Sequence, residues 1–260
     1  MALRLKAEST RSTYGNEEFI VEGKIFHLYL DDPNEREHVK KALCLENYEF
    51  FKEQTGLGHW VLYNPKQYKI AKNRDHKDIL IFNSTDYDGS KLEVPINASS
   101  CCGMFSWVEL PEELELTSMF DTSNVVDMSL MFAGCILPKY FSFGTHFHTY
   151  NVRDMKYMFY KTTLKRGVNL TLDTSHVRDF NHMFAHTIFS DEILLDFDLS
   201  HARDVSFMFN GTCFRKDPVF GKKFEVDDYR MNTDSMFLQA TLDDEIVGRD
   251  ILLTHKINNR

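Results

Sequence analysis

The hydrophobic pattern of the chain has a long period in its last two thirds. Six Met-Phe pairs recur there, and the intervals between successive methionines are 27, 27, 25, 25 and 28 residues. A fixed interval of this size is typical of proteins built from stacked structural repeats. The six pairs are Met104-Phe105, Met131-Phe132, Met158-Phe159, Met183-Phe184, Met208-Phe209 and Met236-Phe237.

Positions counted from each methionine keep their size and polarity from unit to unit. Position +4 carries a small or medium residue. Positions −3 and −6 of the four central units are always apolar, although the size of the side chain varies. Stacked units require such constant columns, because one unit alone cannot bury its apolar face. Position +6 is always large and apolar: Leu110, Leu137, Leu164, Phe189, Phe214 and Leu242.

The spacing of these positions predicts the elements of one unit. Apolar residues at −6, −3, 0 and +1 predict a short helix that ends at the Met-Phe pair, with an Asp at −4 as its cap. Alternation of apolar and polar residues before it, as in 168–172 and 195–199, predicts a strand. An Asp-Thr-Ser sequence predicts a turn between them. We therefore predict an α+β fold: a leucine-rich-repeat-like solenoid of about six coils, each made of strand, turn and short helix.

The first 96 residues lack this period and predict a small α+β unit or N-terminal cap. No linker rich in Pro, Gly or Ser separates residues 1–96 from the solenoid and its C-terminal cap in residues 97–260, so we expect the two to pack together. The expected elements are a hairpin or long strand in 19–30, an amphipathic helix in 32–52, short strands at 60–63, 79–82 and 92–94, and a closing strand at 249–253.

Composition narrows the class of protein. The formal net charge of −9 argues against non-specific nucleic-acid binding, which requires excess positive charge. The five cysteines are odd in number and contain no CxxC pair, which indicates reduced thiols. The sequence shows neither the apolar core of a secretory signal nor a membrane span. We expect a cytoplasmic protein without a membrane partner.

Sequence motifs of common enzymes are missing. There is no GxGxxG, P-loop, HExxH or GxSxG sequence. The phenylalanine and methionine columns indicate a core and not a cofactor pocket. We therefore expect no enzymatic activity, no cofactor and no metal.

An arginine column is the first candidate for function. Arg153, Arg178 and Arg203 occupy position −5 in three successive units, which stacking would place about 5 Å apart. Guanidinium groups bind phosphate or carboxylate in a bidentate fork. The alternative, which we favour at this point, is that they pair with the neighbouring Asp column at −4: Asp127, Asp154, Asp179 and Asp204.

Two further columns contain candidate residues. Position −7 carries Asn124, Asn151, His176 and His201. The two histidines could hold a metal ion, but a hydrogen-bonded ladder between coils is the favoured interpretation. Exposed positions −2 and −1 are where binding specificity should vary, and aromatic and basic residues are common interface anchors. These candidates are Lys156, Tyr157, His182 and Phe207.

A family resemblance rests on four units in the same register. They read TSNVVDMSLMFAGC, NVRDMKYMF, DTSHVRDFNHMF and DLSHARDVSFMF. These sequences closely resemble BspA-type leucine-rich repeats, and the resemblance extends over about residues 97–245. It implies a solenoid fold and a recognition role, often at a bacterial surface.

The sequence therefore favours a non-enzymatic module that presents an extended solenoid surface to a protein partner. A narrower form is an inhibitor encoded by a phage or mobile element, which acts through its acidic surface. The alternatives are an anion- or nucleotide-binding protein that uses the arginine column and, disfavoured because no secretion signal is seen, a surface adhesin.

Overall fold

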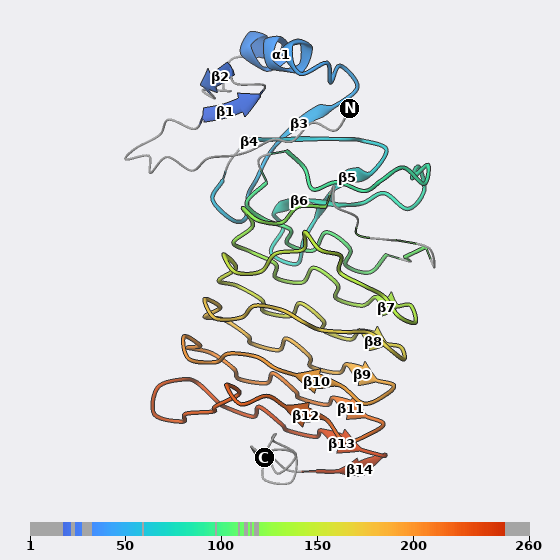
Figure 1. Cartoon of the computed structure of the whole chain (residues 1–260), viewed down its shortest axis with the longest axis vertical. Coiled ribbons are helices and arrows are strands. Elements are labelled where there is room, and N and C mark those ends of the chain that lie inside the picture. Colours follow the sequence, from blue (N-terminus) through green and yellow to red (C-terminus); the bar gives the residue numbers. More distant parts are fainter. Residues whose placement is uncertain are drawn as a thin grey trace.

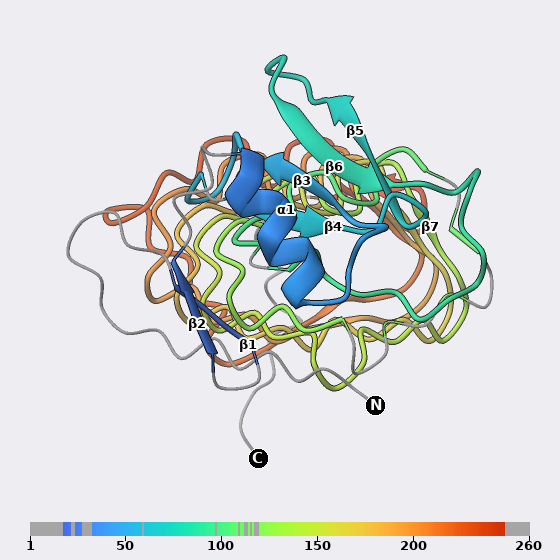
Figure 2. The ribbon, with the colours of Figure 1, turned by 90° about the horizontal axis from the view of Figure 1, so that it is seen from above.

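Strands dominate the structure, and α1 is the only helix among the described residues. The computed structural model describes residues 18–21, 24–27, 33–58, 60–96, 98–108, 110–111, 114, 116 and 120–247. Figure 1 shows turns of chain stacked along the longest axis, with the N-terminal elements at one end. Seen from above in Figure 2, the turns lie over one another, and α1 lies across the end of the stack.

The first elements are a hairpin and a helix. β1 (Glu18–Val21) pairs antiparallel with β2 (Lys24–His27), which confirms a hairpin and not one long strand, beginning one residue before the predicted range. Helix α1 (Pro33–Ala42) begins at a proline, whose fixed φ and missing N–H suit the first helical position. The prediction of a helix as far as residue 52 is wrong, because the chain turns after α1 and forms β3 (Glu49–Lys52).

Two more antiparallel pairs lead to the repeats. β3 pairs with β4 (Trp60–Tyr63), and β5 (Tyr68–Lys72) pairs with β6 (Asp78–Phe82). The predicted strands at 60–63 and 79–82 are therefore confirmed, whereas residues 92–94 form no strand. The β5–β6 hairpin projects from the side of the stack in Figure 2.

Six coils follow, which we number 1 to 6 by their methionines, from Met104 to Met236. Each coil from 2 to 6 contributes a two-residue strand at positions +5 and +6, and these strands pair in parallel along the stack. An antiparallel strand, β14 (Glu245–Ile246), ends this sheet. Its other members are β7 (Ile136–Leu137), β8 (Thr163–Leu164), β9 (Ile188–Phe189), β11 (Cys213–Phe214) and β13 (Thr241–Leu242).

The strands lie elsewhere in the coil than predicted. Residues 168–172 alternate buried and exposed side chains as expected, but they pair with no neighbouring strand. In the 195–199 segment only β10 (Leu194–Leu195) is a strand, paired in parallel with β12 (Val219–Phe220). The predicted turns are confirmed: the Asp173 carboxylate accepts a hydrogen bond from the Ser175 N–H at 3.0 Å.

The Met-Phe segment is a pair of turns whose backbone bonds alternate between two coils. The Phe159 N–H donates to the Met183 carbonyl of the next coil at 2.9 Å, while the Met158 N–H donates to the Met155 carbonyl of its own coil at 3.1 Å. In an α-helix every interior N–H donates within the same segment, so none is left for a neighbouring coil. The predicted short helix is therefore wrong, although its buried positions are right.

Each coil bends sharply through two residues in the left-handed backbone region. Position −1 has φ between 53° and 65°, and position +3 has φ between 55° and 71°, in all six coils. For residues other than glycine this conformation costs about 1 kcal/mol or more. Position +3 is occupied by Trp107, Gly134, Lys161, His186, Gly211 and Gln239.

Large side chains at the rim lie over glycines of the following coil. A Cβ added to Gly134 would lie 2.2 Å from the Trp107 ring. A Cβ on Gly211 would lie 2.5 Å from His186. These glycines serve two purposes, since they adopt the left-handed conformation without strain and leave room for a ring.

A stack of phenylalanine rings runs through the core. The rings at position +1 lie 5.1–5.6 Å apart in successive coils, and their planes differ by at most 13°. Aromatic pairs at such separations add to the free energy gained by burial. The stack consists of Phe105, Phe132, Phe159, Phe184, Phe209 and Phe237, and the methionines beside it are also buried.

The small column at +4 contains a second set of bonds between coils. The Thr212 hydroxyl donates to the Phe184 carbonyl at 2.7 Å, and the Thr162 hydroxyl donates to the Phe132 carbonyl at 2.8 Å. The Cys135 thiol occupies the same place in coil 2. A small polar side chain is buried here because its donor reaches a carbonyl of the preceding coil.

Strands β3 to β6 share their core with the coils. One buried cluster extends from Phe51 to Val247, and the Phe82 N–H donates to the Met104 carbonyl at 2.6 Å. The expected packing of the two parts is therefore confirmed, while a domain boundary at residue 96 stays a prediction. The predicted closing strand at 249–253 lies outside the described residues.

The left-handed backbone at position +3 predicts that introducing a glycine there stabilises the fold and that removing one destabilises it. Gln239→Gly should raise the free energy of unfolding by about 0.5–1 kcal/mol, because glycine adopts this φ without strain. Gly134→Ala should lower it by at least 1 kcal/mol, because the methyl group meets the Trp107 ring. Urea denaturation measures both. A loss of stability in Gln239→Gly would contradict the strain argument.

Candidate interaction surface

The arginine column is a continuous line of hydrogen-bonded backbone. The Arg178 N–H donates to the Arg153 carbonyl at 2.9 Å, and the Arg203 N–H donates to the Arg178 carbonyl at 2.8 Å. Strands paired in this way lie about 4.8 Å apart. All three side chains are exposed. The structure therefore brings the three predicted residues together in one row.

The aspartates at −4 do not neutralise these arginines. Each of the four carboxylates accepts a hydrogen bond from the N–H two residues later, as Asp154 does from Lys156 at 3.0 Å. They cap turns and not helices. Among the described residues, the three guanidinium groups have no ion pair or side-chain hydrogen bond. The favoured Arg–Asp pairing of the sequence analysis therefore does not appear within this part of the chain.

Lys156 is the cation that faces the aspartate column. Its Nζ lies 3.3 Å from the Asp154 carboxylate. The pKa of Asp154 is raised to about 6, chiefly because the carboxyl group is buried; the nearby carboxylates of Asp127 and Asp179 also raise it, while Lys156 lowers it. Lys156 thus has a role inside the stack and is less available to a ligand than the arginines.

Tyr157, His182 and Phe207 form a second row, at position −1. The Tyr157 and His182 ring centroids are 4.6 Å apart, and those of His182 and Phe207 are 4.7 Å apart, with planes within 14°. All three residues are half-buried, so part of each is open to solvent. Each holds a left-handed backbone conformation, with φ of 56° or 57°. We call these three residues and the arginines the Arg–ring face.

A residue from the N-terminal part extends the ring row. The Arg74 guanidinium, from the turn between β5 and β6, lies 5.8 Å from the Tyr157 ring centroid. Burial of the His182 ring lowers the pKa of this histidine, Asp204 opposes that change, and the charge of Arg74 adds a smaller lowering. Nothing in the sequence marked Arg74, because its place depends on how far the hairpin reaches across the coils.

The histidines at −7 lie at the exposed rim of the stack. The His176 and His201 rings are 6.1 Å apart, and each Nδ1 is 3.2 Å from the hydroxyl of the preceding serine. Asn151 makes the expected bond between coils, from its Nδ2 to the Ser123 carbonyl at 2.7 Å. No group of three or more potential metal ligands occurs among the described residues.

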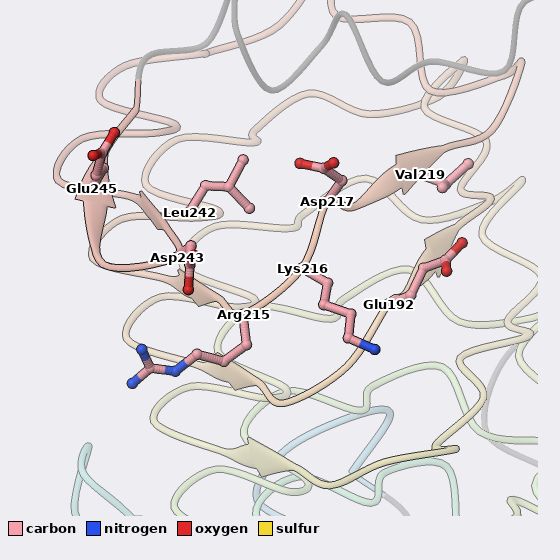
Figure 3. A pocket seen from close by; sticks show the side chains of 8 residues that line it. All are labelled: Glu192, Arg215, Lys216, Asp217, Val219, Leu242, Asp243 and Glu245. Atoms are coloured by element: carbon pink, nitrogen blue, oxygen red, sulfur yellow. The ribbon is translucent and has the colours of Figure 1, made fainter.

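A hollow of about 740 Å³ opens near the last coils, away from the predicted site residues. Figure 3 shows its lining, which carries charges of both signs, among them Arg215, Lys216, Asp217 and Glu245. Arg215 pairs with Asp244, and Lys216 lies 2.5 Å from Asp191. Since these cations are paired with neighbouring carboxylates, the hollow is a weaker candidate than the Arg–ring face.

A buried carboxylate joins the N-terminal elements to coil 1. Glu53 is only 6% exposed and accepts bonds from the Ser99 N–H at 2.9 Å, the Ser99 hydroxyl at 2.6 Å and the Ser100 N–H at 3.1 Å. Burial raises the pKa of Glu53 to about 7, although these bonds oppose the rise. No sequence pattern marks this role of Glu53, because its partners lie more than forty residues away.

The fold and its surface define a repeat protein whose exposed columns are aligned from coil to coil. Comparison with known families agrees. The family described as "Mycoplasma protein of unknown function, DUF285" matches residues 100–164 and 139–247, which together make up more than half of the chain. The chain belongs to this family. The match is consistent with the BspA-type resemblance.

Other comparisons add no relative. No curated protein and no solved structure matches the chain. Within the residues that the structure describes, no helix has the length and apolar character needed to cross a bilayer. The five cysteines, all among the described residues, are free thiols.

The raised pKa values predict a dependence of stability on pH. Glu53 and Asp154 bind protons more tightly when folded than when unfolded. Their stabilising contribution is therefore full below about pH 4 and is lost as the pH rises through 6 and 7. The unfolding free energy of wild type should fall from pH 5 to pH 8. In Glu53→Gln that fall should be smaller by roughly 2 kcal/mol, because the variant has no carboxyl group to lose its proton. Urea denaturation at both pH values measures this.

The matched control is Glu225→Gln, which removes an exposed carboxylate. It should leave the difference between the two pH values unchanged. Equal pH dependence in wild type and Glu53→Gln would show that the buried carboxylate does not titrate in this range.

Proposed function

We propose that this chain is a non-enzymatic protein-binding module that presents the Arg–ring face to a protein partner. The observation that supports this most is the choice of residues at position −1. Tyr157, His182 and Phe207 keep large rings half-exposed on a backbone conformation that glycine adopts more easily. Because the fold needs a left-handed residue at this position in every coil, the backbone does not explain the rings, and their presence where glycine would be less strained favours a role for the side chains.

Other features of the face agree with this proposal. Aromatic and arginine side chains are the residues that most often dominate the free energy of protein binding. Here they repeat over coils 3 to 5 in two rows, so the surface is extended and not a closed pocket. The chain would act by holding a partner, and no reaction is assigned to it.

The proposal also covers the class of repeat and the cellular compartment of the protein. We infer that the coils are of the leucine-rich-repeat kind and that the Met-Phe pair marks the repeat unit of the family. Five free thiols favour a reducing compartment such as the cytoplasm. An inhibitor encoded by a phage or mobile element is the narrower form, which the net charge of −9 alone supports.

Affinity capture with a surface variant tests the proposal. Wild-type protein and Phe207→Ser are used as baits in lysate from the native cell, followed by mass spectrometry. We expect a protein that wild type retains at moderate salt and that Phe207→Ser loses at least tenfold, since aromatic anchors contribute about 2 kcal/mol or more.

Tyr140→Ser is the matched control, because Tyr140 is a ring exposed by 70% outside the Arg–ring face. It should retain the same protein as wild type, and both variants should keep the wild-type far-ultraviolet circular dichroism. Capture that is equal in all three baits, or that is absent, would contradict the proposed function.

A second candidate function is the binding of a small anion or nucleotide. The row of three exposed arginines, without ion pairs among the described residues, favours it. ATP or inorganic phosphate at a hundredfold excess over Kd would then stabilise the fold by about 2.7 kcal/mol. Thermal unfolding of wild type and Arg178→Glu measures this, and an unchanged Tm in wild type would remove the candidate.

A further inference from the structure

We propose that the Arg–ring face binds an acidic α-helix of a protein partner, lying along the stack with its carboxylates on the arginine row and its apolar side chains on the ring row. This inference rests on the proposed function and adds the chemistry and shape of the partner. It is carried by the charge of the face, the spacing along its rows and the upper limit that chain length sets on the distance between them.

Charge is the first step. Within the described part of the chain the three guanidinium groups lack carboxylate partners, and the adjacent aspartates are engaged by backbone N–H groups. Three like charges in one row are most stable when anions face them, and a guanidinium binds a carboxylate through two parallel hydrogen bonds. A carboxylate on the partner would supply the direct side-chain pairing that the described residues do not give these arginines.

Spacing selects a helix over an extended segment. Successive arginines sit on backbones hydrogen-bonded to each other, which places them about 4.8 Å apart, or about 10 Å over the row. Glutamates at i, i+4 and i+7 of a helix rise about 5.4 Å per turn, which gives roughly 10–11 Å. Alternate side chains of an extended strand advance about 6.7 Å, which gives roughly 13 Å and places the third carboxylate a few ångströms out of line.

The distance between the rows also suits a helix. In each coil the arginine precedes the ring by four residues, for example Arg178 and His182, so the two Cα atoms lie at most about 14 Å apart. A helix with its side chains is about 10–12 Å wide. It can therefore contact both rows at once, with an acidic stripe on one side and an apolar stripe on the other.

The face has defined ends. In coil 2 the two positions are Val126 and Leu130, and in coil 6 they are Met231, which is buried, and Ser235. The repeating pattern of charge and ring thus spans three coils. This length fits about two turns of a partner helix, and the chain's net charge of −9 should make the contact specific to this face and sensitive to salt.

Two designed peptides test the inference. The first is a fluorescein-labelled, alanine-rich helix of about 18 residues, a length at which such helices form in water. It carries glutamates at i, i+4 and i+7, and leucines one residue after each, about 100° round the helix. The second has the same composition with its glutamates distributed around the helix. Fluorescence anisotropy at low salt gives both Kd values.

We expect wild type to bind the patterned peptide at least tenfold more tightly than the distributed one. Arg178→Glu and Phe207→Ser should each weaken that binding at least tenfold. Arg166→Glu, which makes the same charge change at an exposed site outside the face, should leave it within twofold of wild type. Thermal unfolding of each variant establishes that it is folded.

Equal affinity for the two peptides, no binding, or binding that Arg178→Glu leaves unchanged would overturn the inference. Tripolyphosphate that binds to wild type as tightly as the patterned peptide would also overturn it, in favour of a phosphate site. The proposed function fails separately: a native protein whose capture depends on Phe207 would support protein binding even if the patterned peptide does not bind.

Discussion

The structure depends on how the backbone N–H groups of the Met-Phe segment are divided between coils. Alternate groups donate to the next coil, and the groups between them donate within their own coil, as Phe159 and Met158 do. This division is possible only if the chain turns through two left-handed residues in every coil. The hydrogen bonds between coils also align the phenylalanine rings, because they fix the register in which one coil stacks on the next.

The same geometry creates the candidate surface. In coils 2 to 6 the residue at position −1 is at least partly exposed, whichever side chain it carries. In coils 2 to 5 the residue at −5 lies on the line of bonds between coils. The scaffold therefore sets where side chains are displayed, while their identity is free to differ between coils. Rings at −1 and arginines at −5 in coils 3 to 5 are a choice of sequence and not a requirement of the fold, which is why they carry functional information.

Much of the stack could be predicted from the sequence, and the failures have physical causes. The period and the buried columns were correct because burial repeats whatever the local backbone is. The short helix was wrong because successive turns and a helix both bring residues three apart to one face, as Met155 and Met158 show. Arg74 and Glu53 were missed, because their partners are distant in sequence. The arginine row was located correctly, but its partner was not: the aspartates cap turns instead.

The rings that lie over glycines limit how this protein can change in length. Trp107 requires Gly134 one coil later, and His186 requires Gly211 in the same way. A duplicated or deleted single coil would often place a ring against a Cβ, because the residue below it would no longer be glycine. Neighbouring coils are therefore matched to each other. Insertion or loss of units should be tolerated when the coil that carries the ring and the coil that carries its glycine are gained or lost together.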